Sequence, residues 1–326
     1  MALTRNAFWK NRHVLVTGGA GFIGYALATA LVRKGARVAV LDVKPSLPSF
    51  TLGAFDARKK ISYVRGTITS KKTVDAILKR KKIQTVFHLA AEAIVRRANE
   101  HPVRTFEANA RGTWVLLESA RRAKNVQEIV VASSDKAYGS HDTLPYREGA
   151  ALQGLNPYDC SKSCTDLIAQ MYAHAFWMPI TVARCGNVYG PGDTHWTRLI
   201  PDSFRCSAKG RVLDIRSDGS YRRDWIYIDD IVDAYLVLAR KTQQHAGEAF
   251  NIGNNKPLTV LQILSHVKRT MPDLRYQILN TARNEIRNQY LDSRKAIRLL
   301  KWRPRTSLAS GVQNTAAWYA QYFSKP

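Results

Sequence analysis

Tyr158 and Lys162 stand four residues apart in a stretch with helical periodicity, which places a phenol and an ammonium on one face of the expected helix. The pKa of a free tyrosine is about 10, so tyrosine serves as a base near neutral pH only where a cation favours its phenolate. Lys162 is such a cation. Because the same spacing is common on helices that only pack or face solvent, the pair indicates proton transfer only in a suitable context.

A second reactive cluster, Ser134-Asp135-Lys136, follows an apolar run at 128–133 that we predict to be a strand. Parallel α/β sheets bind their ligands at the carboxyl ends of the strands, so these three side chains would face a ligand. An adjacent carboxyl and amine could then act as acid and base. The alternative interpretation is an ion pair or a turn-forming aspartate at the end of the strand.

The sequence TGGAGFIG at residues 17–24 follows an apolar strand pattern and opens a helical one. Gly18, Gly21 and Gly24 would permit a tight turn and a close approach of the backbone to a pyrophosphate at the helix N-terminus. Asp42 ends the next predicted strand, 18 residues after Gly24, where a carboxylate can bond ribose hydroxyls. Its charge would repel a 2′-phosphate, so we expect NAD rather than NADP, although Lys44 could offset part of that repulsion.

Short apolar runs alternate with longer helical patterns through the first half of the chain, which predicts an α/β fold with a Rossmann, doubly wound parallel sheet. After about residue 190, loops and short elements indicate a smaller α/β substrate lobe that ends in an amphipathic stretch at 308–323. We assign 1–185 to the NAD-binding domain, with 225–255 returning to it, and 186–224 with 256–326 to the substrate lobe. The expected strands are 13–17, 37–42, 61–65, 85–89, 128–133 and 180–184, and the expected helices are 22–34, 73–81, 103–124 and 158–175.

The composition bears on the location of the protein. No apolar run approaches the roughly 18 residues of a membrane span, and residues 1–11 lack the apolar segment of a secretion signal. We therefore expect a cytoplasmic protein without a membrane span. The four cysteines show no paired spacing and are interpreted as reduced thiols, and no metal site is expected.

The charge is strongly positive: 50 Lys and Arg stand against 25 Asp and Glu, for a formal net charge of +25. Such an excess exceeds what one anionic substrate requires, and short basic clusters at 58–60, 71–72, 79–82 and 121–122 carry much of it. A solvated basic surface is the favoured explanation. Contact with nucleic acid or an anionic membrane is the alternative, and no nucleic-acid-binding motif supports it.

Five motifs together resemble the extended short-chain dehydrogenase/reductase family, in its branch of nucleotide-sugar epimerases and dehydratases. They are TGGAGFIG at 17–24, HLAA at 88–91, YxxxK at 158–162, RCGNVYGPGD at 184–193 and RRDWIYIDD at 222–230. The resemblance covers nearly the whole chain. It implies that Tyr158 and Lys162 are catalytic, and that two subunits pair through the helices at 103–124 and 158–175.

The resemblance also implies which residues hold the ligands. Thr67 departs from the family, which usually has Asp at this position to bond adenine, so the adenine would be held more weakly. Ser134 would bond the reacting oxygen of the sugar. The expected cofactor contacts are Gly18, Gly21, Phe22, Ile23, Gly24, Asp42, Thr67, Ile68, Leu89, Ala90, Ala91, Tyr158 and Lys162. The other expected substrate contacts are Asn187, Arg198, Arg216, Arg223 and Arg287.

Epimerases of this branch typically carry small residues after the Ser or Thr that binds the sugar, whereas dehydratases carry an acid and a base there. Ser134-Asp135-Lys136 therefore resembles the 4,6-dehydratases, and the segments 184–201, 215–216 and 285–287 resemble most closely those of the CDP-glucose type. Loss of water across C5 and C6 of a nucleotide-diphosphate hexose needs a base for the C5 proton and an acid for the 6-hydroxyl, here Lys136 and Asp135. The alternatives are a 4-epimerase with a transient 4-keto intermediate and, in another class, an NAD-binding sensor without turnover.

Overall fold

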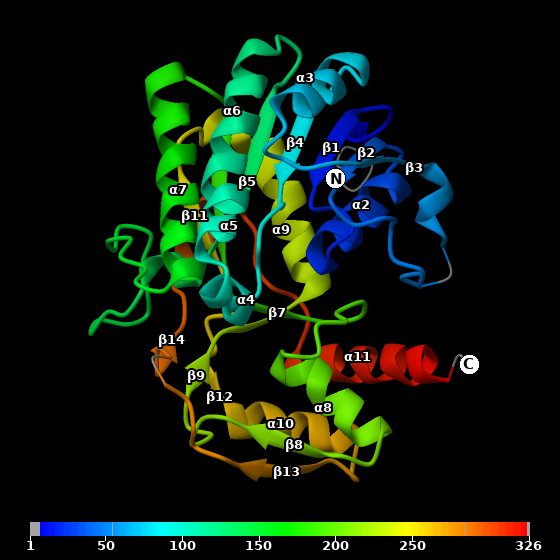
Figure 1. Cartoon of the computed structure of the whole chain (residues 1–326), viewed down its shortest axis with the longest axis vertical. Helices are drawn as coiled ribbons and strands as arrows, with labels where there is room; N and C mark the ends of the chain where they lie inside the picture. Colours follow the sequence, from blue (N-terminus) through cyan, green and yellow to red (C-terminus); the bar gives the residue numbers. More distant parts are fainter. Residues whose placement is uncertain (1–6, 54, 284, 325–326) are drawn as a thin grey trace.

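A seven-stranded parallel sheet forms the centre of the molecule in the computed structural model, which describes residues 7–53, 55–283 and 285–324 (Figure 1). The strand order is β11-β6-β5-β4-β1-β2-β3, so the chain winds outward in one direction from β1 and in the other from β4. This reversal confirms the predicted Rossmann sheet and leaves a crevice at the carboxyl ends of the strands. The strands are β1 (His13–Thr17), β2 (Arg37–Asp42), β3 (Ile61–Arg65), β4 (Thr85–His88), β5 (Glu128–Ser134), β6 (Ile180–Cys185) and β11 (Ala249–Ile252).

Helices cover both faces of the sheet because its strands are apolar on both sides. In β1, Val14 and Val16 belong to one buried cluster and Leu15 to the other, as expected where successive side chains point to opposite faces. Helices α2 (Phe22–Arg33) and α9 (Ile228–Lys241) contribute to the first cluster. Helices α3 (Lys71–Arg80), α6 (Gly112–Arg122) and α7 (Pro157–Phe176) contribute to the second.

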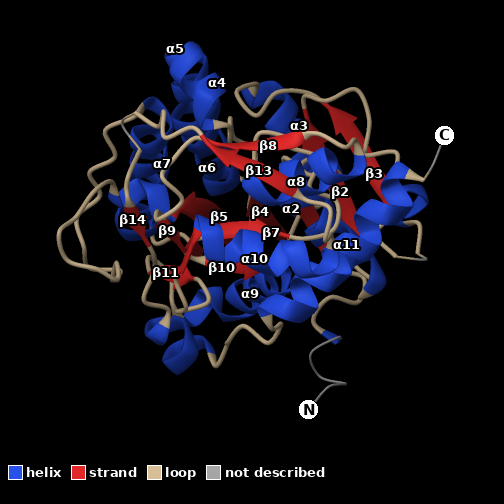
Figure 2. Cartoon of the chain, turned by 90° about the horizontal axis from the view of Figure 1, so that it is seen from below, coloured by secondary structure: helices blue, strands red, loops and turns tan. Residues whose placement is uncertain are grey.

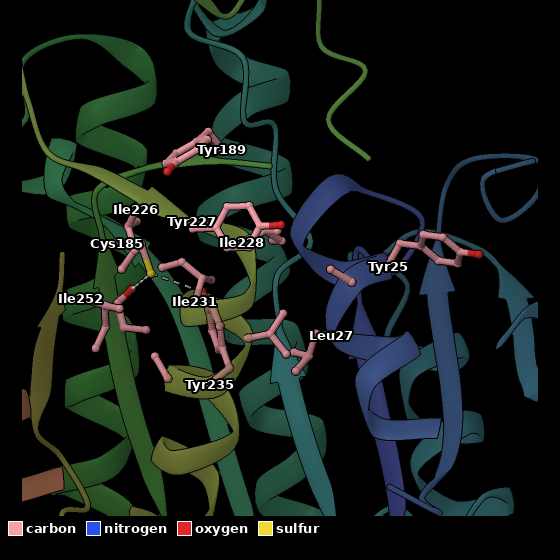
Figure 3. Packing of buried hydrophobic residues seen from close by; sticks show 14 of the residues in the cluster. Tyr25, Leu27, Cys185, Tyr189, Ile226, Tyr227, Ile228, Ile231, Tyr235 and Ile252 are labelled. Atoms are coloured by element: carbon pink, nitrogen blue, oxygen red, sulfur yellow. Dashed lines mark hydrogen bonds between the residues drawn. The ribbon is translucent and has the colours of Figure 1, made fainter. Parts of the chain in front are cut away.

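Tyr235 and Ile231 of α9 pack beside Cys185 of β6 in the first cluster (Figure 3). The sulfur of Cys185 lies 3.8 Å from the Tyr235 hydroxyl. Burial raises the pKa of the Cys185 thiol to about 12, so this cysteine stays protonated and acts as a core residue. Cys160, Cys164 and Cys206 are likewise free. In the described residues, no group of three or more potential ligands is placed to hold a metal ion.

Two helices differ from their expected bounds by more than one residue at an end. Helix α3 begins at Lys71 rather than at residue 73, because the hydroxyl of Ser70 caps its first turn by accepting a hydrogen bond from the Thr73 amide at 3.3 Å. The expected helix at 103–124 is divided into α5 (Pro102–Phe106), a wider π-helical turn at Glu107–Arg111, and α6. It is preceded by α4 (Val95–Glu100).

The second lobe lies beyond one end of the sheet and consists of small sheets and three longer helices (Figures 1 and 2). Its strands pair as β10-β7, β12-β9-β14 and β13-β8. Between β10 and β12 the chain returns to the first domain. There α9 packs on one face of the main sheet, and β11 pairs with β6 at its edge. The lobe contains β7 (Asn187–Tyr189), α8 (Leu199–Ala208), β8 (Val212–Ile215), β9 (Arg222–Arg223), β10 (Trp225–Tyr227), β12 (Leu258–Thr259), α10 (Val260–Thr270), β13 (Arg275–Ile278), β14 (Asn288–Gln289) and α11 (Leu308–Phe323).

Within the described part of the chain, none of the helices combines the length and the apolar character that a membrane crossing requires.

Candidate active site

A cavity of about 1640 Å³ is lined by the carboxyl ends of the central strands and by the second lobe. It brings together predicted site residues that lie far apart in the sequence. Arg287 is the exception, since it is absent from the lining. The predicted residues that line the cavity are Gly18, Gly21, Phe22, Ile23, Gly24, Asp42, Thr67, Ile68, Leu89, Ala90, Ala91, Ser134, Asp135, Lys136, Tyr158, Lys162, Asn187, Arg198, Arg216 and Arg223.

The turn between β1 and α2 has no room for larger residues. Gly18 has a φ of 70°, and a Cβ atom at this position would lie 2.8 Å from the backbone of Ala90. A Cβ atom at Gly24 would lie 2.2 Å from the carbonyl oxygen of Gly18. Gly21 precedes α2 and supplies no side-chain cap, so the first N–H groups of this helix remain available to a ligand. The turn therefore fits an anionic pyrophosphate.

Asp42 is tied to this turn through its carboxylate. Its Oδ2 accepts a hydrogen bond from the amide of Ala20 at 2.9 Å, and its Oδ1 accepts one from the amide of Lys44 at 3.0 Å. The Lys44 ammonium donates to the carbonyl oxygen of Ala20 at 2.9 Å. A carboxylate held at the end of β2 suits a ribose with free hydroxyls and opposes a phosphorylated one.

His88 supports the cavity wall from behind. Its ring nitrogens lie 2.8 Å from the hydroxyl of Thr17 and 3.0 Å from that of Thr113. Burial lowers the pKa of His88 to about 3, so the imidazole is neutral and serves to hold its neighbours. The Thr17 hydroxyl in turn accepts hydrogen bonds from the amides of Leu89 and Ala90, both at 3.2 Å.

Tyr158 and Lys162 lie on the buried face of α7, with 9% and 5% of their surfaces exposed. The Lys162 ammonium donates to the carbonyl oxygen of Ala132 at 2.8 Å, and burial lowers the pKa of Lys162 to about 8. Burial, followed by the carboxylate of Asp135, raises the pKa of Tyr158 well above its ordinary value. The chain by itself therefore holds Tyr158 as a neutral phenol, and the direct contact of the ammonium is with Ala132.

Ser134 connects Tyr158 to Asp135. Its hydroxyl donates to Oδ1 of Asp135 at 3.0 Å, and the same hydroxyl acts to lower the pKa of Tyr158. Asp135 begins a short 3₁₀ turn at Asp135–Tyr138, is only 2% exposed, and has no hydrogen-bond partner for its Oδ2. Burial raises the pKa of Asp135, and the Lys136 ammonium opposes part of that rise. The site thus favours a protonated carboxylic acid next to an amine.

Lys136 reaches toward the second lobe, where its ammonium donates to the amide oxygen of Gln289 at 3.0 Å. Asp159, the neighbour of Tyr158 on α7, is 3% exposed and also lines the cavity. Its Oδ1 has no hydrogen-bond partner. Burial raises the pKa of Asp159, and the charge of Lys136 lowers it. Lys136 therefore lies in the field of two buried carboxyl groups.

The four arginines that were expected to contact the substrate differ in their surroundings. Arg198 pairs with the buried Asp193 at 3.0 Å, and Arg216 pairs with an exposed acid at 2.6 Å. Arg223 donates to main-chain oxygens of β9 and of Arg287, so its guanidinium lies across the start of β14. The Arg287 side chain is exposed and binds Asp218 and Ser220 at 3.3 Å, outside the cavity lining.

Several lining residues are ones that sequence reasoning did not single out. Asp159 could have been noticed, because it directly follows Tyr158 within the YxxxK motif. Arg97 and His195 also line the cavity. Gln289 contacts Lys136, but this contact could not be recognised from the sequence because 153 positions separate the two residues.

Comparison with protein families gives one match, to the NAD dependent epimerase/dehydratase family, over residues 14–253. Among curated proteins, a CDP-glucose 4,6-dehydratase of Salmonella typhimurium is 30% identical, with 96% of this chain and 91% of the relative covered. A trifunctional UDP-glucose 4,6-dehydratase of Arabidopsis thaliana is 27% identical over 97% of this chain. The chain spans only about half, 48%, of the length of that relative.

Similar solved structures include both dehydratases and epimerases. A dTDP-glucose 4,6-dehydratase of Streptomyces venezuelae, solved with NAD, has a TM-score of 0.85 and 29% identity, with 94% of this chain and 97% of that chain covered. A UDP-glucose 4-epimerase of Thermotoga maritima has a TM-score of 0.86 and 29% identity, with 95% and 99% covered.

Proposed function

The chain belongs to the NAD dependent epimerase/dehydratase family, and from this membership we propose that it is a nucleotide-sugar 4,6-dehydratase. Its substrate is a nucleoside diphosphate glucose, and its product is the corresponding 4-keto-6-deoxy sugar. The relatives named above act on CDP-, UDP- and dTDP-glucose, which supports the sugar and leaves the base open. One observation carries the proposal. A buried carboxyl and an amine, Asp135 and Lys136, adjoin Ser134 and Tyr158 in one cavity.

The residues of the first domain fit NAD. The turn at Gly18, Gly21 and Gly24 would hold the pyrophosphate, Asp42 would bond the adenosine ribose, and Ile68 would lie beside the adenine. Thr67 is exposed, and its hydroxyl is 2.8 Å from that of Thr69, so it offers adenine a weaker partner than a carboxylate. When bound, NAD supplies the redox chemistry, which removes a hydride from C4 of the sugar and returns it at C6.

Tyr158, Ser134 and Asp135 form a path for a proton. The positive charges of Lys162 and of bound NAD would favour the Tyr158 phenolate, which accepts the proton of the 4-hydroxyl while C4 is oxidised. The resulting ketone acidifies the hydrogen at C5. Asp135 gives its own proton to the departing 6-hydroxyl, which leaves as water. The Ser134 hydroxyl, which is hydrogen-bonded to Asp135 and acts on the pKa of Tyr158, then passes the tyrosine proton to the carboxylate. The proton from the 4-hydroxyl thus replaces the one that left with water.

Lys136 provides the base for C5. Its amine takes the C5 proton as the C6–O bond breaks and returns it to C5 when C6 is reduced, so Lys136 ends each turnover unchanged. Burial of Asp135 supports this division of roles, because it raises the pKa of the carboxyl group and favours the acid that must protonate the leaving hydroxyl.

Mass analysis of the sugar product tests this function. The protein is incubated with NAD and, separately, with CDP-, UDP-, dTDP- and GDP-glucose, and we expect one of them to lose one water. Asp135→Asn should stop the loss of water, because the leaving hydroxyl then has no acid. A product of unchanged mass would instead identify a 4-epimerase, which the solved epimerase structure supports as the second candidate. Tight NAD binding without conversion of any sugar would indicate a sensor.

We also propose a homodimer that pairs α6 and α7 with their counterparts in a second copy. These helices pack side by side in Figure 1, and their outer faces leave large apolar side chains exposed. Leu167 is 55% exposed, Met171 46% and Trp114 45%, and Val103 of the preceding α5 is 77% exposed. Exposed apolar side chains gathered on one face are typical of a subunit interface. Sedimentation should therefore give a dimer for the wild type and a monomer for Trp114→Glu. A monomeric wild type would contradict the proposal.

The excess positive charge is proposed to be a solvated surface of a cytoplasmic protein. Arg58 pairs with Asp56, and Arg121 and Arg122 both pair with Glu118. In the cluster at 71–72, Lys71 pairs with Asp75. The cluster at 79–82 spans the C-terminal end of α3, where cations complement the helix dipole. Saturable binding to RNA or to anionic vesicles at physiological salt would contradict this interpretation.

A further inference from the structure

The catalytic lysine of the proposed reaction is held by a residue from the other lobe. Lys136 has one hydrogen-bond partner for its ammonium in the described residues, the amide oxygen of Gln289 at 3.0 Å. Gln289 is completely buried, and its amide nitrogen has no hydrogen-bond partner. An unsatisfied buried amide destabilises the fold, so an apolar side chain would serve better if the position were only structural. The contact with Lys136 explains why an amide stands there.

The backbone on both sides of Gln289 is fixed. Strand β14 is parallel to β9, with Gln289 opposite Arg223. On the other side of the segment, the amide of Tyr146 donates to the carbonyl oxygen of Tyr290 at 2.9 Å, and the amide of Asp292 donates to that of Tyr146 at 2.8 Å. Gln289 therefore meets Lys136 from a position that the main chain determines.

The second lobe thus acts on the acid and on the base through two different strands. Arg223 of β9 lowers the pKa of Asp135 electrostatically, and Gln289 of β14 binds Lys136. The charged groups that act on Lys136 are Asp135, its neighbour, and Asp159 of α7. Burial raises the pKa of both carboxyl groups and so favours their neutral forms, which place little negative charge beside the lysine. An ionised carboxylate at position 289 would favour the ammonium form of the lysine, whereas an amide adds no charge.

We propose that Gln289 is a positioning residue for Lys136: it directs the lysine nitrogen and, as a neutral acceptor, allows that nitrogen to lose its proton before it acts on C5. This inference rests on the proposed dehydration. It also links substrate binding to the base, because Leu279, Thr281 and Glu285, in the segment that leads into β14, line the cavity.

The test compares Gln289→Glu with Asn288→Asp. Both variants replace an amide with a carboxylate on the same strand, but Asn288 is exposed and Gln289 is buried. Rates of water loss and of C5 hydrogen exchange in D₂O are measured from pH 6 to 10, together with KM and the melting temperature. A nearby carboxylate raises a lysine pKa by about one unit or more, so Gln289→Glu should be about tenfold slower at neutral pH and recover as the pH rises.

The Gln289→Met variant distinguishes the positioning of the Lys136 nitrogen from the effect of an added negative charge. It removes the acceptor without adding a carboxylate, so we expect a lower kcat with no upward displacement of the pH profile and little change in KM. Asn288→Asp should match the wild type throughout. A Gln289→Glu variant with the rate and pH profile of Asn288→Asp would overturn the inference, as would equal profiles for Gln289→Glu and Gln289→Met. A wild-type protein that removes no water from any nucleotide sugar would instead refute the proposed function.

Discussion

Replacing Lys162 with Met should stabilise the protein while it abolishes turnover. Lys162 is 5% exposed, and burial lowers its pKa to about 8 from an ordinary value of 10.5. That displacement corresponds to a cost of about 3 kcal/mol for holding the ammonium in the folded chain at neutral pH. Methionine carries no charge into this site. It does leave the carbonyl oxygen of Ala132 without its donor, which costs about 1 kcal/mol.

The net expectation is a gain of about 2 kcal/mol in the free energy of unfolding at pH 7. Urea unfolding of the protein without added NAD measures it, and Lys72→Met, which removes an exposed lysine from α3, serves as the control with a change below about 0.5 kcal/mol. The gain should shrink as the pH rises. Above about pH 8 the folded lysine loses its proton while the unfolded one keeps it to about 10.5, so the wild type gains stability relative to the variant.

A Lys162→Met variant that unfolds at a lower urea concentration than the wild type at pH 7 would contradict the expected gain in stability. A stability difference that does not change between pH 7 and pH 10 would contradict its expected pH dependence. Either result would mean that the Lys162 ammonium is stabilised in the fold rather than tolerated for its role in the site.

Two other substitutions test the cofactor turn and the core. Gly24→Ala should lower the affinity for NAD at least tenfold in calorimetry, since its Cβ would meet the Gly18 oxygen at 2.2 Å, whereas Gly149→Ala, with open space around it, should bind normally. Arg184→Met should lower the free energy of unfolding by about 3 to 5 kcal/mol in urea, because the carboxylate of Asp166, now 2.8 Å from the guanidinium, would stay buried without a cation, bonded only to the Gln170 amide.

The first domain could be predicted from sequence because its signals are local. Apolar runs of strand length alternate with helical patterns, and each glycine of the turn at 17–24 is required by contacts within a few residues or by the adjacent strand. The capping hydroxyl of Ser70 is equally local, but the hydrophobic pattern alone does not reveal it. The second lobe was harder to predict, because its strands are two to four residues long and carry no measurable period.

The chemistry of the site was only partly predictable for the same reason. The order Ser134-Asp135-Lys136 and the spacing of Tyr158 and Lys162 identify the groups that react, but not what each one contacts. Lys162 was expected beside the phenol, and its ammonium is bonded to the carbonyl oxygen of Ala132. Gln289 could not be found from sequence, since only the folding of the second lobe onto the sheet brings it to Lys136.

The most direct test of the account uses nucleoside diphosphate glucose that carries deuterium at C4. The protein is incubated with this sugar and NAD, and the product is analysed by mass spectrometry and by NMR of C6. We predict a sugar that has lost one water and carries the deuterium at C6, because the hydrogen taken from C4 is returned within the same turnover. A product of unchanged mass with the deuterium still at C4 would contradict the account.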